Sequence, residues 1–207
     1  MGFLELNTTQ QFLPRFDLDL RAGRFFAVER TQGADGEWAS EKIEIESPSF
    51  AADIGNTAIG YTAFIENRPD SIMHHQEDGM PAQPSPEHKP GFEVTVKLIG
   101  GDYDGSVRKF GKQGLTIGRA FDELVDAWQA HKNSKDKTKV PVIQVTGSTA
   151  IKVGRMGSQN YAPKWGIAKW IARPEEFDQW IPQRIDPVAE QAKQDVVDKI
   201  DGDELPF

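Results

Sequence analysis

One stretch in the last third of the chain combines positively charged and aromatic side chains at close spacing. A single nucleic-acid strand is held by cations that meet its phosphates and by flat rings on which its bases stack. The sequence KVGRMGSQNYAPKWGIAKW, residues 152–170, offers both kinds of group. The candidate side chains in it are Lys152, Arg155, Tyr161, Lys164, Trp165 and Lys169.

The two tryptophans of this stretch are not expected to act together. In a strand over 164–172, Trp165 and Lys169 would share one face and Trp170 would lie on the other. At most one tryptophan would then face a strand-binding groove. The alternative for each ring is packing in the core, and both readings stay open at this point.

Further candidates lie outside this stretch. Phe64 falls opposite the expected core face of its strand and could stack on a base, or it could belong to a second core layer. Lys97 faces outward from the most regular strand. Basic residues also flank the first strand or follow the glycines after residue 100: Arg21, Arg24, Arg30, Arg108, Lys109 and Lys112. Any one of these charges could simply be solvated.

Other chemistry has less support. His74, His75 and His88 lie near Glu77 and Asp78 in a proline-rich segment, where nothing fixes the geometry that a metal site needs. The nucleophile, phosphate-loop and dinucleotide motifs GxSxG, GxxxxGK[ST] and GxGxxG after a strand are absent. We therefore expect neither catalysis nor a cofactor or metal, although the many carboxylates leave a general acid–base pair open.

Composition limits the class of protein. The chain has 207 residues, of which 38% are hydrophobic, and this is enough for one packed domain with appendages. It has no cysteine, which excludes disulfides and thiolate metal sites. The first residues lack the pattern of a signal peptide, and no apolar stretch could cross a membrane. We expect a soluble cytoplasmic protein without a membrane partner.

The net charge of −8 is unevenly distributed. From Glu175 onward, ten acidic and three basic residues give −7, which leaves −1 for residues 1–174. A nearly neutral body can still hold a locally basic groove, because the field depends on where the charges cluster.

Hydrophobic periodicity predicts a mainly β body with one helix. Apolar residues alternate over 24–30, 42–46, 57–66, 92–99, 140–146, 149–154 and 164–172, as in strands. From Ile117 to Trp128 the spacing becomes helical, with Thr116 as the expected N-cap. Five of the strands, with the helix between the third and fourth, match an OB-fold-like five-stranded Greek-key barrel, in which 42–46 and 149–154 are insertions.

Two segments are expected to lie outside this core. Residues 67–90 hold five prolines among Asp, Gly, Ser and His, which predicts an exposed, mobile loop. Residues 175–207 form an acidic extension that we expect to be disordered. The chain thus divides into an OB-like nucleic-acid-binding domain, 1–174, and an acidic linker with a C-terminal tip, 175–207.

The last residues carry a family resemblance. The chain ends in DGDELPF, with acidic residues before an apolar tripeptide. This end resembles the acidic C-terminal tip of bacterial and phage single-stranded DNA-binding proteins, with Gly202 and Leu205 as departures from the usual pattern. The hairpin sequence Val-Pro-Val-Ile followed by Tyr-Ala-Pro-Lys-Trp is similar to a group of small phage proteins. The matching tip residues are Asp201, Asp203, Glu204, Leu205, Pro206 and Phe207.

The resemblance implies a function. Proteins of this family coat single-stranded DNA in replication, recombination and repair, and recruit partner proteins through the tip. Here Phe207 and Pro206 would fill an apolar pocket of the partner, while Glu204 and Asp203 would meet basic residues at its rim. Two alternatives stay open: an adaptor of the same machinery that binds no DNA, and a metal-dependent nuclease. The sequence leaves the oligomeric state open, a homo-oligomer included.

Overall fold

The structure is a computed structural model that describes residues 13–32, 36–66, 68–134, 136, 138–153 and 157–184. Ten strands and one α-helix lie in these residues, and the prediction of a mainly β protein with one helix is confirmed. The strands are β1 (Arg15–Asp19), β2 (Arg24–Gln32), β3 (Trp38–Ile45), β4 (Ser49–Ala52), β5 (Ala58–Ile65), β6 (Arg68–His75), β7 (Lys89–Ile99), β8 (Val107–Gln113), β9 (Lys139–Val153) and β10 (Ser158–Ala172). The helix is α1 (Leu115–Ser134), and short 3₁₀ turns are η1 (Ile54–Asn56), η2 (Gln76–Asp78), η3 (Gly101–Tyr103) and η4 (Glu175–Trp180).

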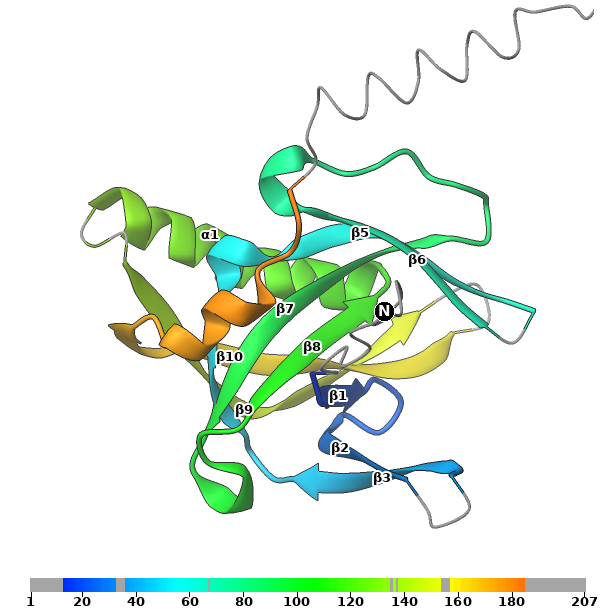
Figure 1. Cartoon of the computed structure of the whole chain (residues 1–207), viewed down its shortest axis with the longest axis horizontal. Coiled ribbons are helices and arrows are strands. Elements are labelled where there is room, and N and C mark those ends of the chain that lie inside the picture. Colours follow the sequence, from blue (N-terminus) through cyan, green and yellow to red (C-terminus); the bar gives the residue numbers. More distant parts are fainter. Residues whose placement is uncertain are drawn as a thin grey trace, which may run out of the picture.

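All ten strands belong to one strongly curved sheet (Figure 1). Its main order is β10-β9-β4-β7-β8-β1-β2-β3, and the hairpin of β5 and β6 joins it through β7. The sheet is open, since strand pairing does not link its two ends. One backbone hydrogen bond, from the Tyr161 amide to the Leu20 carbonyl at 2.7 Å, nevertheless brings β10 next to the end of β1.

Phenylalanines fill the concave side of the sheet. Strand alternation sends Phe16, Phe50, Phe92 and Phe110 inward, and each is at most 5% exposed. The apolar face of α1 packs on them, with the ring of Phe121 stacked on Phe92 at 4.0 Å between centroids. The helix begins at Leu115, so Thr116 lies within its first turn rather than at the predicted cap.

The proline-rich segment is only partly a loop. Residues 68–75 form β6, which pairs with β5 along its whole length, and irregular structure is confined to 79–88. Pro69 is tolerated because β6 is an edge strand. Gly60 of β5 permits the pairing, because a Cβ there would lie 1.9 Å from the Ile72 carbonyl oxygen. The expectation of one loop over 67–90 is therefore wrong.

Two other elements differ from the prediction. The glycine-rich segment after Ile99 contains β8, because Gly100, Gly101 and Gly105 adopt positive φ and form only the turn that precedes the strand. Residues 139–153 form one long strand rather than two. The five strands of the predicted OB-type barrel do not include β8.

Candidate nucleic-acid interface

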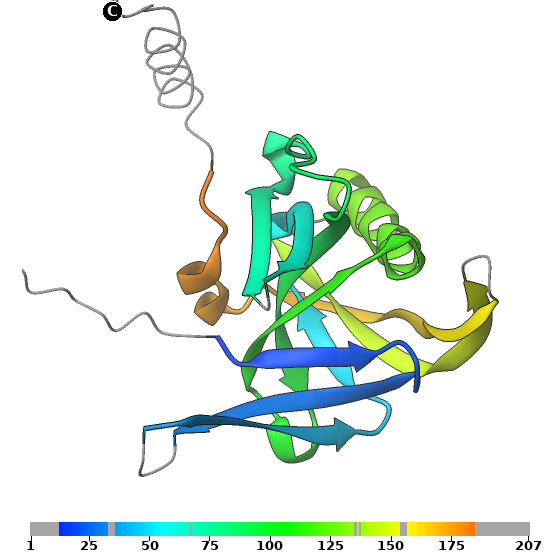
Figure 2. The ribbon, with the colours of Figure 1, turned by 90° about the vertical axis from the view of Figure 1, so that its right-hand side faces the viewer.

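A broad groove of about 1050 Å³ runs across the sheet between two hairpins. In the strand order β6-β5-β7-β8-β1-β2-β3, strands β7 and β8 form its floor, β5 and β6 one wall, and β1 to β3 the other. Figure 2 shows the two walls as the teal and blue hairpins on either side of β8. This volume is slightly larger than the ~300–1,000 Å³ of typical small-molecule pockets, which is consistent with an open groove.

An aromatic ring is exposed on each wall. Phe64 of β5 is 71% exposed and Trp38 of β3 is 62% exposed, and both line the groove. Single exposed apolar side chains are common, but two aromatic rings that line one groove from opposite walls are informative. The Arg30 guanidinium lies 5.8 Å from the centre of the Trp38 ring. A third ring, Trp180 of η4, also lines the groove.

The groove is more positive than the chain as a whole. Four basic side chains line it against two acidic ones, a net charge of +2 in a protein of net charge −8. The acids are both engaged: Glu93 pairs with Lys109 at 2.8 Å, and Glu29 pairs with the buried Arg108 at 2.5 Å. The basic side chains are Arg15, Arg30, Lys109 and Lys112.

A buried carboxylate joins the floor to one wall. Asp17 of β1 is 7% exposed and forms ion pairs with Lys42 of β3, at 2.9 Å, and with Lys112 of β8. Burial alone would raise the pKa of Asp17, but the hydrogen bonds and charges of Lys112 and Lys42 outweigh it and lower the pKa from 3.8 to about 2. The carboxylate is thus ionised at neutral pH and holds the β2–β3 hairpin in place.

The tryptophans of the predicted hairpin face the core instead. The Trp165 indole donates its N–H to the Ala120 carbonyl of α1 at 3.0 Å and meets Phe110 edge-on. The Trp170 ring stacks on His131 of α1 at 3.7 Å. A register shift between Ile167 and Lys169 breaks the strand alternation, so both tryptophans reach the same side. The expectation that they face opposite ways, with Trp165 as a stacking ring, is therefore wrong.

The charged residues of that hairpin lie away from the groove. Lys164 and Lys169 are exposed on β10, and Lys152 lines a smaller hollow of about 620 Å³ beside the start of α1. Tyr161 is half-buried against Gly23, and its hydroxyl oxygen accepts a hydrogen bond from Gln159. None of these four lines the groove with Phe64, and Arg155 lies outside the described residues.

Of the remaining predicted residues, Arg30, Lys109 and Lys112 line the groove together with Phe64. Arg24 pairs with Glu44 at 3.1 Å, and Lys97 pairs with Glu176 of η4 at 2.6 Å. Arg108 is 3% exposed and lies over the Tyr103 ring, so it serves the fold and cannot meet a ligand at the surface. The alternation of side chains along β8 turns Arg108 toward the core, so the prediction that Arg108 binds DNA is wrong.

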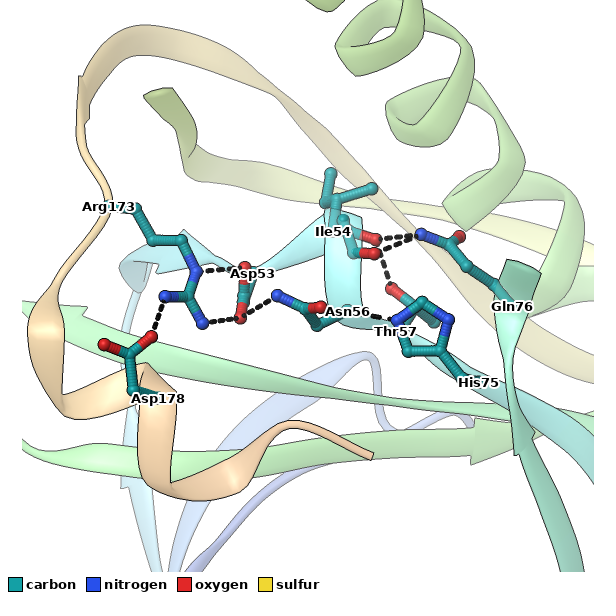
Figure 3. Close-up of polar contacts among 9 residues, drawn as sticks. Asp53, Ile54, Asn56, Thr57, His75, Gln76, Arg173 and Asp178 are labelled. Carbon is teal, nitrogen blue, oxygen red and sulfur yellow. Dashed lines mark hydrogen bonds and ion pairs between the residues drawn. The ribbon is translucent and has the colours of Figure 1, made fainter. Parts of the chain in front are cut away.

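The body continues past the predicted boundary at residue 174. Phe177 of η4 is fully buried against β4 and β9. In Figure 3 the Arg173 guanidinium lies between two carboxylates, with bonds of 2.8 and 2.9 Å to the buried Asp53 and a further pair with Asp178. These hydrogen bonds raise the pKa of Arg173.

The same network reaches the β5–β6 wall (Figure 3). Asn56 donates to Asp53 at 3.0 Å and lies 3.3 Å from His75 Nε2. His75 Nδ1 accepts the Glu77 amide, so the proton is on Nε2 and donates to Asn56. Arg184 then pairs with Glu77 and Asp78 of η2. The predicted tip residues, 201–207, lie outside the described part of the chain.

Sequence reasoning missed three groove residues: Trp38, Arg15 and Trp180. A signal existed for Trp38, because it stands in WASEKIEI, where no other aromatic residue accompanies it and charged residues alternate with apolar ones. A tryptophan in a strand with so many charged residues has few apolar neighbours against which it could be buried. Arg15 and Trp180 carried no comparable signal.

In the described ranges no group of three or more His, Cys, Asp or Glu side chains could hold a metal ion. No helix in the part of the chain described here has the length and apolar character needed to span a membrane. Comparison with protein families, curated proteins and solved structures finds no match for this chain.

Proposed function

We propose that this protein binds single-stranded DNA, without catalysing a reaction, in the groove between its two hairpins. The observation that carries the proposal is the pair of exposed rings, Trp38 and Phe64, on facing walls of a groove with net positive charge. Bases of an unpaired strand stack on such rings without regard to sequence, and the phosphates meet Arg15, Arg30 and Lys109.

The strand connections support an OB-like origin for the body. We propose that β4 with β5 corresponds to the first OB strand, β7 and β8 to the second and third, and β9 and β10 to the last two, with α1 in between. OB folds bind oligonucleotides on the face of their second and third strands, beside the loop that joins the first to the second. In this chain the face of β7 and β8 is the floor of the groove. The segment between β5 and β7, which contains β6, takes the place of the loop between the first and second OB strands.

The C-terminal tip would serve a second task in this scheme. Arg184, the last described residue, is anchored to η2 at the end of the β5–β6 wall. An acidic tip tethered there, Asp201 to Phe207, would recruit replication or repair proteins close to the bound strand. We propose this role for the tip on its resemblance alone, and a phage origin and cytoplasmic location follow from the same resemblance.

Fluorescence anisotropy of labelled oligo-dT and of a matched duplex tests the proposal. The full chain should bind the single strand preferentially and lose affinity steeply as salt rises. Trp38→Ala and Phe64→Ala should each weaken oligo-dT binding by roughly 5- to 150-fold, because one base stacked on an aromatic side chain contributes about 1–3 kcal/mol. Leu115→Ala is the matched control, since Leu115 is 70% exposed but lies outside the groove.

Deletion of residues 201–207 completes the experiment. If the tip only recruits partners, the shortened chain should bind oligo-dT as tightly as the full chain or more tightly. Failure of both forms to bind oligo-dT would contradict a DNA-binding function and favour the adaptor alternative. Equal loss in Leu115→Ala and Trp38→Ala would contradict the location of the site.

A further inference from the structure

Strand β3 is an unusually open end of the sheet. Among the described strands it pairs only with β2, and every residue from Trp38 to Glu44 is exposed, so both of its faces meet water. Figure 2 shows the β2–β3 hairpin extending along the lower side of the molecule, away from α1. A two-stranded ribbon is marginally stable by itself, and a free edge offers a row of backbone N–H and C=O groups to another strand.

Proline and register shifts, which discourage such pairing, mark the other two edges of the described sheet but not β3. β6 contains Pro69, and β10 has two register shifts and packs against α1. β3 has no proline, and its register with β2 runs without a shift from Ile45 to Trp38. A regular edge without proline or bulge can accept a further strand, and the charges of Glu41, Lys42 and Glu44 restrict it to a strand whose charges oppose them.

The sequence of β3 is self-complementary about Ile43. In an antiparallel pair with a two-fold axis through Ile43, this residue faces its own copy, and Lys42 faces Glu44 of the second copy on both sides of the axis. Ile43 is 37% exposed and would be covered by the contact. Opposite charges placed directly across two strands stabilise the pairing.

Contacts within the chain already hold these charges in place. Lys42 reaches Asp17 at 2.9 Å, and Glu44 accepts a hydrogen bond from Arg24 at 3.1 Å. Each acid and base of the contact therefore has a fixed neighbour of opposite sign. Alternating charges of this kind favour a register in which Lys42 faces Glu44 over one in which like charges meet.

We propose that β3 pairs antiparallel with β3 of a second copy of this chain, which continues the sheet across a homodimer. This pairing does not depend on the proposed DNA binding. If both hold, the two grooves lie on one continuous sheet, because Trp38 belongs to the pairing strand.

Sedimentation velocity of the full chain without DNA, over a range of protein concentrations, tests the pairing. The mass should rise with concentration from 23.1 kDa toward twice that value. Ile43→Lys puts two like charges on the axis and should weaken association at least tenfold. Ile72→Lys is the matched control, because Ile72 is 39% exposed on the edge strand β6, and it should associate as the unchanged protein does.

A second variant tests the register. Glu44→Lys faces Lys42 of the other copy and should also remain monomeric, while circular dichroism shows that each variant keeps its fold. A protein that stays at 23.1 kDa at every concentration would overturn the proposal. So would undiminished association of Ile43→Lys or Glu44→Lys, or an equal loss in Ile72→Lys.

Discussion

The groove and the β9–β10 hairpin use aromatic residues in opposite ways. Trp38 and Phe64 at the groove expose most of their surface, whereas Trp165 and Trp170 pack against α1 and help to close the core. By composition the hairpin is the better candidate for nucleic-acid binding, because its tryptophans stand among lysines. Among the aromatic side chains of the described residues, Trp38 and Phe64 are the two that are largely exposed, and both lie at the groove.

The difference teaches that the neighbours of a ring decide its role. Trp165 has an acceptor for its N–H in the Ala120 carbonyl and an edge contact with Phe110, so burial leaves no polar group unsatisfied. Trp38 lies on a hairpin without a helix above it. A ring there is left to solvent unless a ligand covers it.

The largest expected effect separates the two regions by stability. Trp165→Ala removes a partly buried ring that packs on the core, together with its hydrogen bond to the Ala120 carbonyl, so the free energy of unfolding should fall by about 3 kcal/mol. Trp38→Ala should change it by no more than about 0.5 kcal/mol, as exposed substitutions do. Urea denaturation followed by circular dichroism measures both.

Oligo-dT binding of the same variants gives the reverse order. Trp165→Ala, studied at low temperature where it stays folded, should bind normally, and Trp38→Ala should bind weakly. A stable Trp165→Ala that loses DNA binding would return the site to the β9–β10 hairpin.

Much of the fold could be predicted because its signals are local. The alternation of Phe92, Val94, Val96 and Leu98 predicted β7, and helical spacing from Ile117 to Trp128 predicted α1. The strands that were missed depend on distant partners. β8 is a strand because β7 and β1 pair with it, and β6 because β5 does, so composition suggested loops in both places.

The candidate site was harder to predict for the same reason. Phe64 and Lys109 were found from strand alternation and charge, but the groove also needs β1 to β3 beside β8, and that parallel pairing of β1 joins residues some ninety positions apart in sequence, Arg15 and Lys109. Arg108 and Lys109 are adjacent and equally basic. The alternation of side chains along β8 turns Arg108 toward the core and Lys109 toward solvent, and the sequence does not show which of the two faces inward.

The next effect concerns the ion pairs of Asp17. They hold the β2–β3 hairpin by charge, whereas the β9–β10 hairpin is held by packing against α1. The pKa of Asp17 is lowered in the folded state, so its contribution to stability is present above about pH 4 and is lost as the pH falls toward 2. Asp17→Asn should lower the free energy of unfolding by about 2 kcal/mol at pH 7, and the gap from the unchanged protein should close in acid.

Urea denaturation at a series of pH values measures that gap. Trp165→Ala is the comparison, because its deficit comes from packing and should stay constant as the pH falls. A gap for Asp17→Asn that persists at pH 2 would show that the carboxylate acts through its shape and not through the ion pairs with Lys42 and Lys112.

The smallest effect distinguishes the lysines of the two regions. Lys109→Gln removes a phosphate-binding charge from the groove and should reduce the slope of log affinity against log salt by about 1. Lys169→Gln makes the same change on β10 and should leave the slope unaltered. Anisotropy titrations with oligo-dT at several salt concentrations measure both slopes.

Because Lys109 also neutralises Glu93, the affinity of Lys109→Gln should fall at low salt as well, where the uncovered carboxylate repels the strand. A smaller slope in Lys169→Gln would mean that the bound strand continues from the groove onto the β9–β10 hairpin, and that the two regions form one surface.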